Sequence, residues 1–216
     1  MLQLFYSTFV KINSLLYDKN IRKINKVNVP VISIGNISTG GSGKTPFTQT
    51  IVRKLIAINQ KPTIIGRGYN RKSNGLVVVS DGKKVQHTVK IAGDELYLHA
   101  IKNPVAVIAY SNKFKASKSS IEKFESNIIL LDDGFQHRKL FRDLDIVLID
   151  DFTVNQKFLL PKGRLREPFS ALNRADVICL QEGIDSQEIP YKIQPHQLII
   201  TTKTIAGKPY LLKQIS

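Results

Sequence analysis

Eight consecutive residues near the start of the chain have the types expected of a loop that binds phosphate groups. They are Ser38, Thr39, Gly40, Gly41, Ser42, Gly43, Lys44 and Thr45. Glycines let backbone N–H groups turn toward an anion without clashes from Cβ atoms. In such a loop the lysine reaches the terminal phosphates of a nucleotide, and the hydroxyl that follows it ligates Mg²⁺. The usual pattern begins with glycine, and Ser38 departs from it.

The flanks of the loop strengthen the prediction of a nucleotide site. Residues 29–34 are apolar and rich in β-branched types, as in a buried strand. Beyond the loop, apolar residues recur at helical spacing, at Phe47, Ile51, Leu55 and Ile58. A strand, the loop and a helix in this order form the context that a P-loop requires, and the helix N-terminus adds partial positive charge.

A second apolar run, residues 128–131, ends in two acids, Asp132 and Asp133. Magnesium prefers hard oxygen ligands, and an acid at the end of a strand completes the metal site of many P-loop proteins. Asp-Asp-Gly is also a common turn, so its position downstream of a P-loop carries the prediction. The sequence leaves open which of the two acids ligates Mg²⁺.

Two further segments hold polar residues at predicted element boundaries. Asp94 and Glu95 open a predicted helix, where Asp94 suits an N-cap or, alternatively, a base that accepts a hydroxyl proton. Spacing alone favours the cap. Arg67 and Arg71 follow the second predicted strand, at the same end of the sheet as the P-loop, where arginines can clamp phosphate. An ordinary basic loop is the alternative.

Short runs rich in Val and Ile alternate with helical stretches along the chain. The runs predicted as strands are 29–34, 62–65, 104–109, 128–131, 146–149 and 177–180, and the predicted helices are 44–58, 94–101 and 112–124. Continuous apolar runs fit strands covered on both faces, so we expect a mainly parallel sheet in a three-layer α/β/α, P-loop NTPase-like fold. Asp81-Gly82, between strand-like segments 76–80 and 84–90, predicts a small β-hairpin insertion.

The composition is that of a globular protein with a strong positive charge. The 216 residues include 32 Lys and Arg against 17 Asp and Glu, for a net charge of +15. This charge favours polyanions: nucleic acid, an anionic membrane or phosphorylated substrates. The single cysteine, Cys179, excludes a disulfide framework and a cysteine-rich zinc site.

The N-terminal segment has one apolar stripe followed by basic residues. The stripe consists of Leu2, Phe5, Phe9, Ile12 and Leu16, and Lys19, Arg22, Lys23 and Lys26 follow it. The run is interrupted by Lys11, is too short to cross a bilayer and lacks the features of a signal peptide. It fits either an interfacial helix on an anionic membrane or a helix that packs its stripe on the protein body, and spacing does not decide between them.

Taken in order, these segments resemble the tetraacyldisaccharide 4′-kinases of lipid A biosynthesis. The resemblance lies in residues 29–46, 67–69, 93–95, 131–138 and 165–168. Members of that family carry Ser or Thr where Ser38 stands, so the departure from the general P-loop pattern supports the resemblance.

The resemblance implies transfer of the γ-phosphate of ATP, with Mg²⁺, to the 4′-hydroxyl of tetraacyldisaccharide 1-phosphate, giving lipid IV-A. It implies that Asp94 is the catalytic base, that Lys44 and Thr45 contact phosphate and Mg²⁺, and that Asp132 and Asp133 form the acidic metal site. Residues in shared motifs, assigned to substrate or phosphate contact, are Arg67, Arg71, His137, Arg166 and Glu167.

The resemblance also implies a location and partners. We expect a monomer on the cytoplasmic face of a Gram-negative inner membrane, bound to an anionic surface and a lipid-linked disaccharide, without nucleic acid. Residues 1–28 are then a membrane-associated helix with a basic linker, and 29–216 a P-loop kinase domain without the C-terminal part of the family fold.

Two departures from the family pattern carry further expectations. Asn70 stands where glycine is usual, and asparagine tolerates the left-handed backbone that glycine would adopt. Family members continue beyond the segment that resembles residues 205–210, so a truncation or frameshift near Tyr210 is predicted, with an incomplete cleft and weak or absent turnover.

Two other classes of protein remain as alternatives. A membrane-recruited ATPase of the partitioning kind would carry lysine where Thr39 stands, and a GTPase would carry an Asn-Lys-x-Asp string that the chain lacks. A remnant that binds nucleotide without catalysis is the other alternative.

Overall fold

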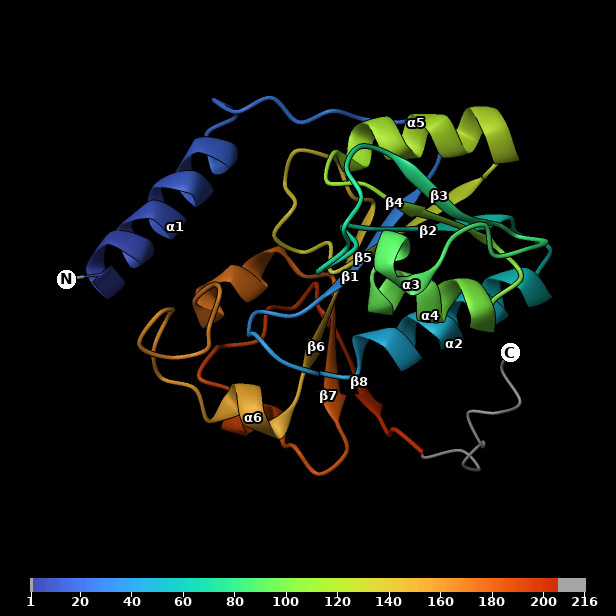
Figure 1. Ribbon diagram of the computed structural model, residues 1–216. Helices are drawn as coiled ribbons and strands as arrows, with labels where there is room; N and C mark the ends of the chain where they lie inside the picture. The colour runs from blue at the N-terminus through green and yellow to red at the C-terminus, as the bar shows by residue number, and fades with distance from the viewer. Residues whose placement is uncertain (1, 206–216) are drawn as a thin grey trace.

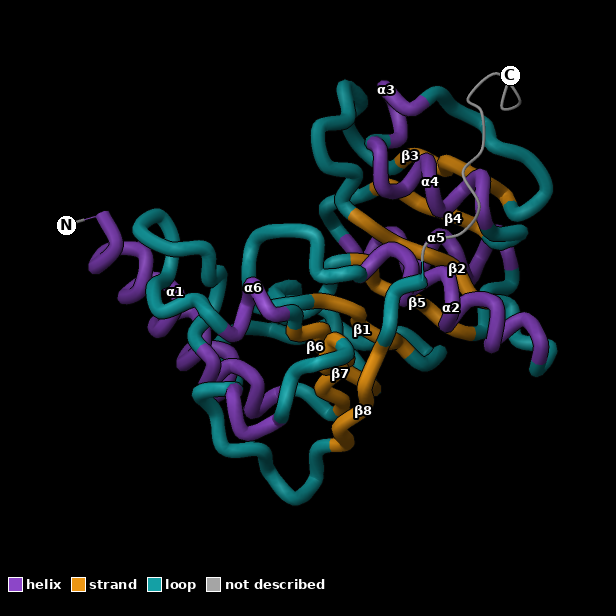
Figure 2. The backbone as a smooth tube through the Cα atoms, turned by 90° about the horizontal axis from the view of Figure 1, so that it is seen from below, coloured by secondary structure: helices purple, strands orange, loops and turns teal. Residues whose placement is uncertain are grey.

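A computed structural model describes residues 2–205 of the chain and has an eight-stranded sheet at its centre. The strands are β1 (Val31–Gly35), β2 (Pro62–Gly66), β3 (Val77–Asp81), β4 (Ala106–Ala109), β5 (Ile128–Asp132), β6 (Leu144–Ile149), β7 (Val177–Gln181) and β8 (Leu198–Thr202). Their order is β3-β4-β2-β5-β1-β6-β7-β8, which Figure 2 shows from one end of the sheet to the other. Neighbours run parallel except β3, which is antiparallel to β4.

Helices cover both faces of this sheet (Figure 1). They are α1 (Leu2–Asp18), α2 (Lys44–Ala57), α3 (Val89–Ala92), α4 (Asp94–Lys102), α5 (Lys113–Phe124) and α6 (Asp151–Val154), with 3-10 turns η1 (Phe169–Arg174) and η2 (Ser186–Glu188). On one face, Val52 of α2 and Leu96 of α4 pack on the strands, and on the other Ala116 of α5 does so. These layers confirm the predicted α/β/α fold.

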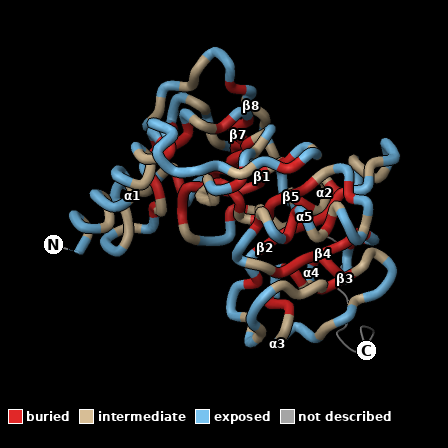
Figure 3. The backbone as a smooth tube through the Cα atoms, turned by 90° about the horizontal axis from the view of Figure 1, so that it is seen from above, coloured by how far each residue is buried: buried red, intermediate tan, exposed pale blue. Residues whose placement is uncertain are grey.

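The central strands lie in the interior because their side chains are apolar on both faces. Every residue of β2 is buried, and in β5 only Ile128 is partly exposed. Figure 3 shows the buried residues concentrated along β1, β2, β4 and β5. Burial of the apolar surface on both faces drives the parallel sheet to form, and it leaves the polar carboxyl ends of the strands to carry the chemistry.

The turn predicted at Asp81-Gly82 is confirmed, but the predicted second strand of the hairpin, residues 84–90, is wrong. The Asp81 carboxylate accepts hydrogen bonds from the backbone N–H groups of Lys83 and Lys84, at 2.9 Å each, which closes the turn. The returning chain contacts β3 through the bridge between Ser80 and Val85, the backbone bond from Gln86 to Val79 and the bond from the Gln86 side chain to Asp81, and then forms α3. β3 pairs instead with β4, because this pairing buries Val79 completely in the main core.

The N-terminal helix α1 turns its apolar stripe away from the protein. Leu2, Phe5, Phe9 and Ile12 are between 51% and 74% exposed. The contacts to the body come from polar groups on the opposite side: the Tyr6 hydroxyl donates to the Arg166 carbonyl at 3.0 Å. Four of the five residues of the predicted stripe therefore do not pack on the body, and the fifth, Leu16, is half-buried. Among residues 2–205, no helix is long and apolar enough to cross a membrane.

Candidate active site

Four loops meet at the carboxyl edge of the sheet. Because β1 lies between β5 and β6, and β2 lies beside β5, the segments that follow these strands are neighbours in space. They are the phosphate loop after β1, Arg67 after β2, Asp133 after β5 and Asp150 after β6. The topology therefore gathers polar residues from four distant parts of the sequence.

The phosphate loop has the backbone geometry of an anion cradle. Gly40 has a φ of 134° and Gly43 a φ of 77°, values that L side chains rarely adopt. A Cβ atom built on Gly40 or Gly41 would meet nothing within 4 Å, so the space beside these two glycines is open. Helix α2 begins at Lys44 directly after it, and its free N–H groups point toward this space.

Ser38 has a structural reason to replace the usual glycine. Its side chain is buried, and its hydroxyl lies 2.7 Å from the hydroxyl of Thr153 in α6. Thr153 in turn donates to the Asp150 carboxylate, which follows β6. The hydroxyl of Ser38 thus ties the start of the phosphate loop to α6, and glycine could not make this link.

The segment 164–166 holds the loop from the other side. The N–H of Thr39 donates to the Arg164 carbonyl at 2.7 Å, and the N–H of Arg166 donates to the Ile37 carbonyl at 2.7 Å. Ser38 and Leu165 form an antiparallel bridge between these bonds. The motif around residue 166, to which spacing assigned no role, therefore forms one wall of the phosphate loop.

Arg166 and Lys44 converge on Asp133. The guanidinium of Arg166 donates to both carboxylate oxygens of Asp133, at 2.7 and 2.8 Å, and Lys44 Nζ lies 3.7 Å from the same carboxylate. Burial alone would raise the pKa of Asp133, but the hydrogen bonds and charge of Arg166, with Lys44, lower it to about 2. Asp133 is therefore ionised at neutral pH, beside the P-loop lysine.

Asp132 faces the other way and contacts two residues that sequence reasoning missed. Its carboxylate is buried, and Oδ2 lies 3.3 Å from Nε2 of His99 in α4. Its carbonyl accepts a hydrogen bond from Nζ of Lys113 at 2.7 Å. Lys113 is itself buried, which lowers its pKa. Lys113 could have been predicted from its position shortly after β4, at the carboxyl edge of the sheet. The position of His99 inside a predicted helix gave no such indication.

The N-terminus of α4 brings both of its acids to this edge. Asp94 is exposed, and its carboxylate makes no hydrogen bond or ion pair with any other residue in the described range 2–205. The pKa of Glu95 is raised, first by burial and then by the negative charges of Asp132 and Asp133, which Lys44 opposes. Glu95, which had no assigned role, therefore lies close enough to the acidic pair and the P-loop lysine to feel their charge.

The two arginines of the loop after β2, Arg67 and Arg71, have different surroundings. Arg71 donates to the carbonyls of Ala109 at 3.1 Å and Gly75 at 2.6 Å, so its guanidinium holds the loop and is not brought to the phosphate loop. Asn70 has a φ of 56°, the left-handed conformation expected for it. Arg67 remains exposed at the carboxyl edge.

Arg67 borders a polar pocket of about 340 Å³ next to Asp133. The pocket is lined by Arg67, Ser111, Lys113, Asp133, Gln136, His137 and Arg166. Burial, followed by the positive charges of Lys113, Arg142 and Lys139, lowers the pKa of His137 to about 4. His137 is therefore neutral at pH 7 and can both donate and accept a hydrogen bond.

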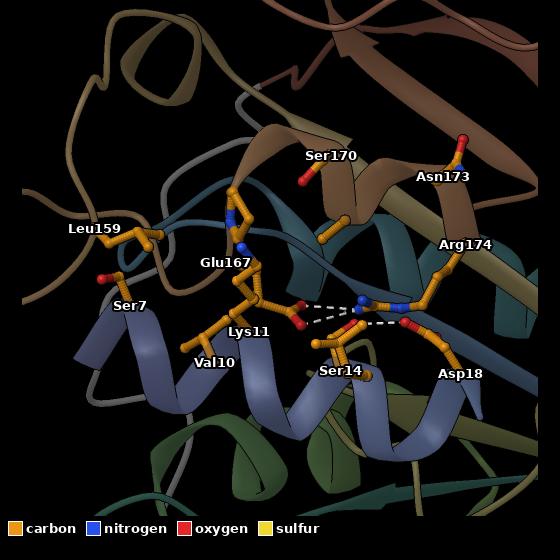
Figure 4. Close-up of a pocket in the computed structure, with 13 residues that line it drawn as sticks. Ser7, Val10, Lys11, Ser14, Asp18, Leu159, Glu167, Ser170, Asn173 and Arg174 are labelled. Atoms are coloured by element: carbon orange, nitrogen blue, oxygen red, sulfur yellow. Dashed lines mark hydrogen bonds and ion pairs between the residues drawn. The ribbon is translucent and has the colours of Figure 1, made fainter. Parts of the chain in front are cut away.

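Glu167 lies elsewhere than the other predicted contact residues. Its buried carboxylate accepts from Arg174 at 2.9 Å and from Gln136 at 3.0 Å. As Figure 4 shows, the pair of Glu167 and Arg174 borders a cavity of about 510 Å³ between α1 and η1. The carboxylate of Glu167 is therefore held at this cavity by Arg174 and Gln136, while its backbone N–H donates to the Ile37 carbonyl, next to the phosphate loop, at 3.3 Å.

A parallel sheet with a phosphate loop after β1, a helix that starts at its lysine, and an acid pair after β5 defines a P-loop nucleotide-binding protein. The model of the Tetraacyldisaccharide-1-P 4′-kinase family matches residues 1–213. The chain belongs to this family, as the resemblance of its motifs predicted.

Individual relatives agree with the family match. The chain is 42% identical over 191 residues to a tetraacyldisaccharide 4′-kinase of Pelodictyon phaeoclathratiforme, covering 85% of this chain and 53% of that protein. It is 43% identical over 176 residues to that of Aquifex aeolicus, covering 81% and 55%. The chain spans about half the length of the curated relatives it matches.

A solved structure agrees with the fold. The protein is similar to the crystal structure of LpxK from Aquifex aeolicus in complex with ATP, with a TM-score of 0.82 and 38% identity; the match covers 93% of this chain and 62% of that one. Membership in this family decides against the partitioning ATPase and the GTPase. The segment around Tyr210, where a truncation was predicted, lies outside the described residues.

Proposed function

We propose that this protein transfers the γ-phosphate of ATP to the 4′-hydroxyl of tetraacyldisaccharide 1-phosphate, giving lipid IV-A. The observation that supports it most is the convergence of Lys44, Asp133 and Arg166 on the open phosphate loop, with Asp94 and Glu95 at the same edge. The proposal uses the activity named for the relatives, and extends it to a chain of about half their length.

The residues at the phosphate loop fit ATP with Mg²⁺. The open cradle at Gly40 and Gly41 leaves room for phosphate oxygens, and Lys44 would contact them. Among residues 2–205 there is no cluster of three or more His, Cys, Asp or Glu side chains that could hold a metal alone. Magnesium needs only one or two carboxylates beside phosphates and water, so Thr45 with Asp132 or Asp133 would suffice. The bound ion would neutralise charge that develops on the transferred phosphoryl group.

Asp94 is the residue we propose as the base. Its carboxylate is exposed and unpaired among the described residues, so it is available to accept a proton from a sugar hydroxyl that approaches the edge of the sheet. For Glu95 beside it, burial and then the negative charges of Asp132 and Asp133 raise the pKa, an effect that Lys44 opposes. The two adjacent acids thus have different surroundings, which suits two different tasks.

The pocket beside Asp133 suits a phosphorylated sugar. Arg67 and Lys113 contribute positive charge, and neutral His137 contributes a hydrogen bond. Arg71 and Glu167 are held in other contacts, so we propose that they shape the site without touching the substrate.

The outward apolar stripe of α1 supports attachment to a membrane, which is where a lipid substrate resides. We propose that residues 1–28 form this attachment on the cytoplasmic face of the inner membrane of a Gram-negative bacterium. Residues 29–216 then carry the nucleotide site, and the protein acts as a monomer.

One experiment tests the proposed activity. The purified chain is incubated with Mg-ATP and tetraacyldisaccharide 1-phosphate in detergent micelles, beside the full-length Aquifex aeolicus enzyme, and the phosphorylated product is measured. Product from both chains supports the proposal. ATP binding by this chain without product, while the control turns over, overturns it in favour of a nucleotide-binding remnant.

A further inference from the structure

The segment that follows α6 lies beside the first half of α1. Leu159 of this segment and Ser7 of α1 line the same cavity, and the Tyr6 hydroxyl of α1 bonds the carbonyl of Arg166 at the end of the segment. In Figure 1 the loop after α6 lies next to the N-terminal half of α1, on the same side of the molecule. Two stretches that are about 150 residues apart in sequence thus border the same cavity.

This second stretch also exposes large apolar side chains. Phe152 of α6 is 44% exposed and Phe158 is 42% exposed. Each ring has a cation beside it: Lys162 Nζ lies 3.8 Å from the centre of the Phe158 ring, and the Arg164 guanidinium 5.8 Å from that of Phe152. Exposed aromatic rings flanked by long basic side chains are typical of the boundary between lipid headgroups and acyl chains.

The charge of the stretch is one-sided. Between residues 155 and 165 there are three basic residues, Lys157, Lys162 and Arg164, and no acidic one. Helix α1 has one basic residue, Lys11, and one acid, Asp18, which pairs with Arg138 of the body. Each lysine or arginine near an anionic leaflet is attracted to it. The combination of apolar rings with positive charge is complementary to an anionic bilayer, whereas an apolar protein partner would gain nothing from three cations that have no acidic partner among residues 2–205.

We propose that the segment 152–164 is a second membrane contact, which docks with α1 on the same anionic bilayer. Phe152 and Phe158 enter the headgroup region, and Lys157, Lys162 and Arg164 contact lipid phosphates. The proposal rests on the membrane attachment proposed for α1 and adds a second point to it. A helix alone leaves the protein free to roll about the helix axis, whereas two contacts fix which side of the molecule meets the bilayer.

The two contacts flank the cavity between α1 and η1. Its lining includes Ser7 and Val10 of α1 on one side and Leu159 on the other (Figure 4). Docking through both contacts therefore places α1 and the segment 152–164, which both border this cavity, against the same bilayer.

A fluorescence experiment tests the second contact directly, because the chain has no tryptophan. Phe158→Trp places a single reporter in the segment, and Ile58→Trp places a matched reporter at the far end of α2, where Ile58 is 64% exposed. Each protein is mixed with vesicles of phosphatidylcholine and phosphatidylglycerol, with and without brominated acyl chains. We expect a blue shift and quenching for Phe158→Trp and neither for Ile58→Trp. Unchanged Phe158→Trp emission on protein that sediments with the vesicles overturns the proposal.

Vesicle sedimentation separates this proposal from the attachment of α1. We expect the double variant Phe152→Ser/Phe158→Ser to bind these vesicles about tenfold more weakly than wild type, and Ile58→Ser to bind like wild type. Phe5→Ser/Phe9→Ser reports on α1 in the same assay. If only the α1 variant loses binding, the second contact is wrong while the attachment of α1 stands; if wild type does not bind at all, both are wrong. Retention of ATP binding by each variant shows that it is folded.

Discussion

The two sides of the candidate site differ in how firmly they are held. On the nucleotide side, formed by residues 36–45, Asp133 and 164–166, backbone bonds, the Ser38–Thr153 link and the Arg166–Asp133 pair connect every element to its neighbours. On the acceptor side, formed by residues 67–71 and the start of α4, Arg71 holds the loop, but the side chains of Arg67 and Asp94 are exposed. A phosphate loop held by many bonds suits ATP, and exposed side chains on the acceptor side suit a lipid substrate that arrives from a membrane. Changes on the first side should therefore affect ATP binding and stability, and changes on the second should affect turnover alone.

The largest effect is expected on the acceptor side. Asp94→Asn removes the proposed base without changing its size, and should lower kcat by about 10²–10⁴-fold. Because Asp94 has no partner among residues 2–205, the melting temperature and the Kd for ATP should stay at their wild-type values. Phosphorylation kinetics and calorimetry with ATP measure the two quantities. A weaker Kd for ATP would show that the acceptor side is not separate from the nucleotide side.

The matching change on the nucleotide side is Lys44→Ala. It should lower kcat by about 10²–10³-fold, because Lys44 is the proposed donor to the transferred phosphate. In contrast to the Asp94 variant, it should also weaken ATP binding, which the same calorimetry measures. Lys54→Ala, at the other end of α2, is the control. Wild-type ATP affinity in the Lys44 variant would contradict the proposed assignment.

His137 lies where the two sides meet, and it gives stability a pH dependence. Its folded pKa of about 4 lies below the ordinary value of 6.5, so the folded protein favours the neutral ring. The stability it contributes is complete above pH 6.5 and is lost as pH falls toward 4, by at most about 3 kcal/mol at 1.36 kcal/mol per pKa unit. Urea unfolding at pH 7 and pH 4.5 should show this loss in wild type and a smaller loss in His137→Gln. Equal losses in the two proteins would contradict the burial of a neutral His137.

The smallest effect tests the firmness of the nucleotide side. Ser38→Ala removes the hydroxyl that contacts Thr153 and leaves the Thr153 hydroxyl without this partner. We expect a loss of about 1 kcal/mol in the free energy of unfolding and a small loss in ATP affinity. Ser119→Ala, on α5 away from the site, is the control. If unfolding is unchanged in Ser38→Ala, the link does not brace the loop.

The sequence predicted those parts of the protein that depend on local pattern. Runs of Val and Ile marked β1, β2, β5, β6 and β7 because strands buried on both faces need apolar residues at every position. β8 was missed because it forms the edge of the sheet, where Leu198 is 59% exposed and the pattern is weak. The hairpin was overextended, since a turn signal at Asp81 does not reveal that β4 competes for the same strand.

The candidate site was likewise predictable where it depends on local pattern and not where it depends on packing. The phosphate loop and the acid pair follow from residue types at fixed spacing. His99 and Lys113 join the site only because α4 and α5 pack next to the end of β5, which is a tertiary event. The direction of Arg71, toward the carbonyl of Ala109, likewise depends on a strand that lies 38 residues away. Local pattern therefore identifies the cradle, and packing determines what surrounds it.

The reversed orientation of α1 has a consequence for handling the protein. A helix on the surface of a globular protein usually shows water its polar side, whereas α1 uses its polar side, through Tyr6 and Ser14, to hold the body. In buffer without detergent, we expect the protein to self-associate through the exposed apolar stripe of α1, because this contact removes the apolar surface from water. A mild detergent can cover this side while the bonds that hold the helix stay intact. Light scattering that falls at the critical micelle concentration, with unchanged ATP binding, would show that the protein self-associates through α1 while its fold stays intact.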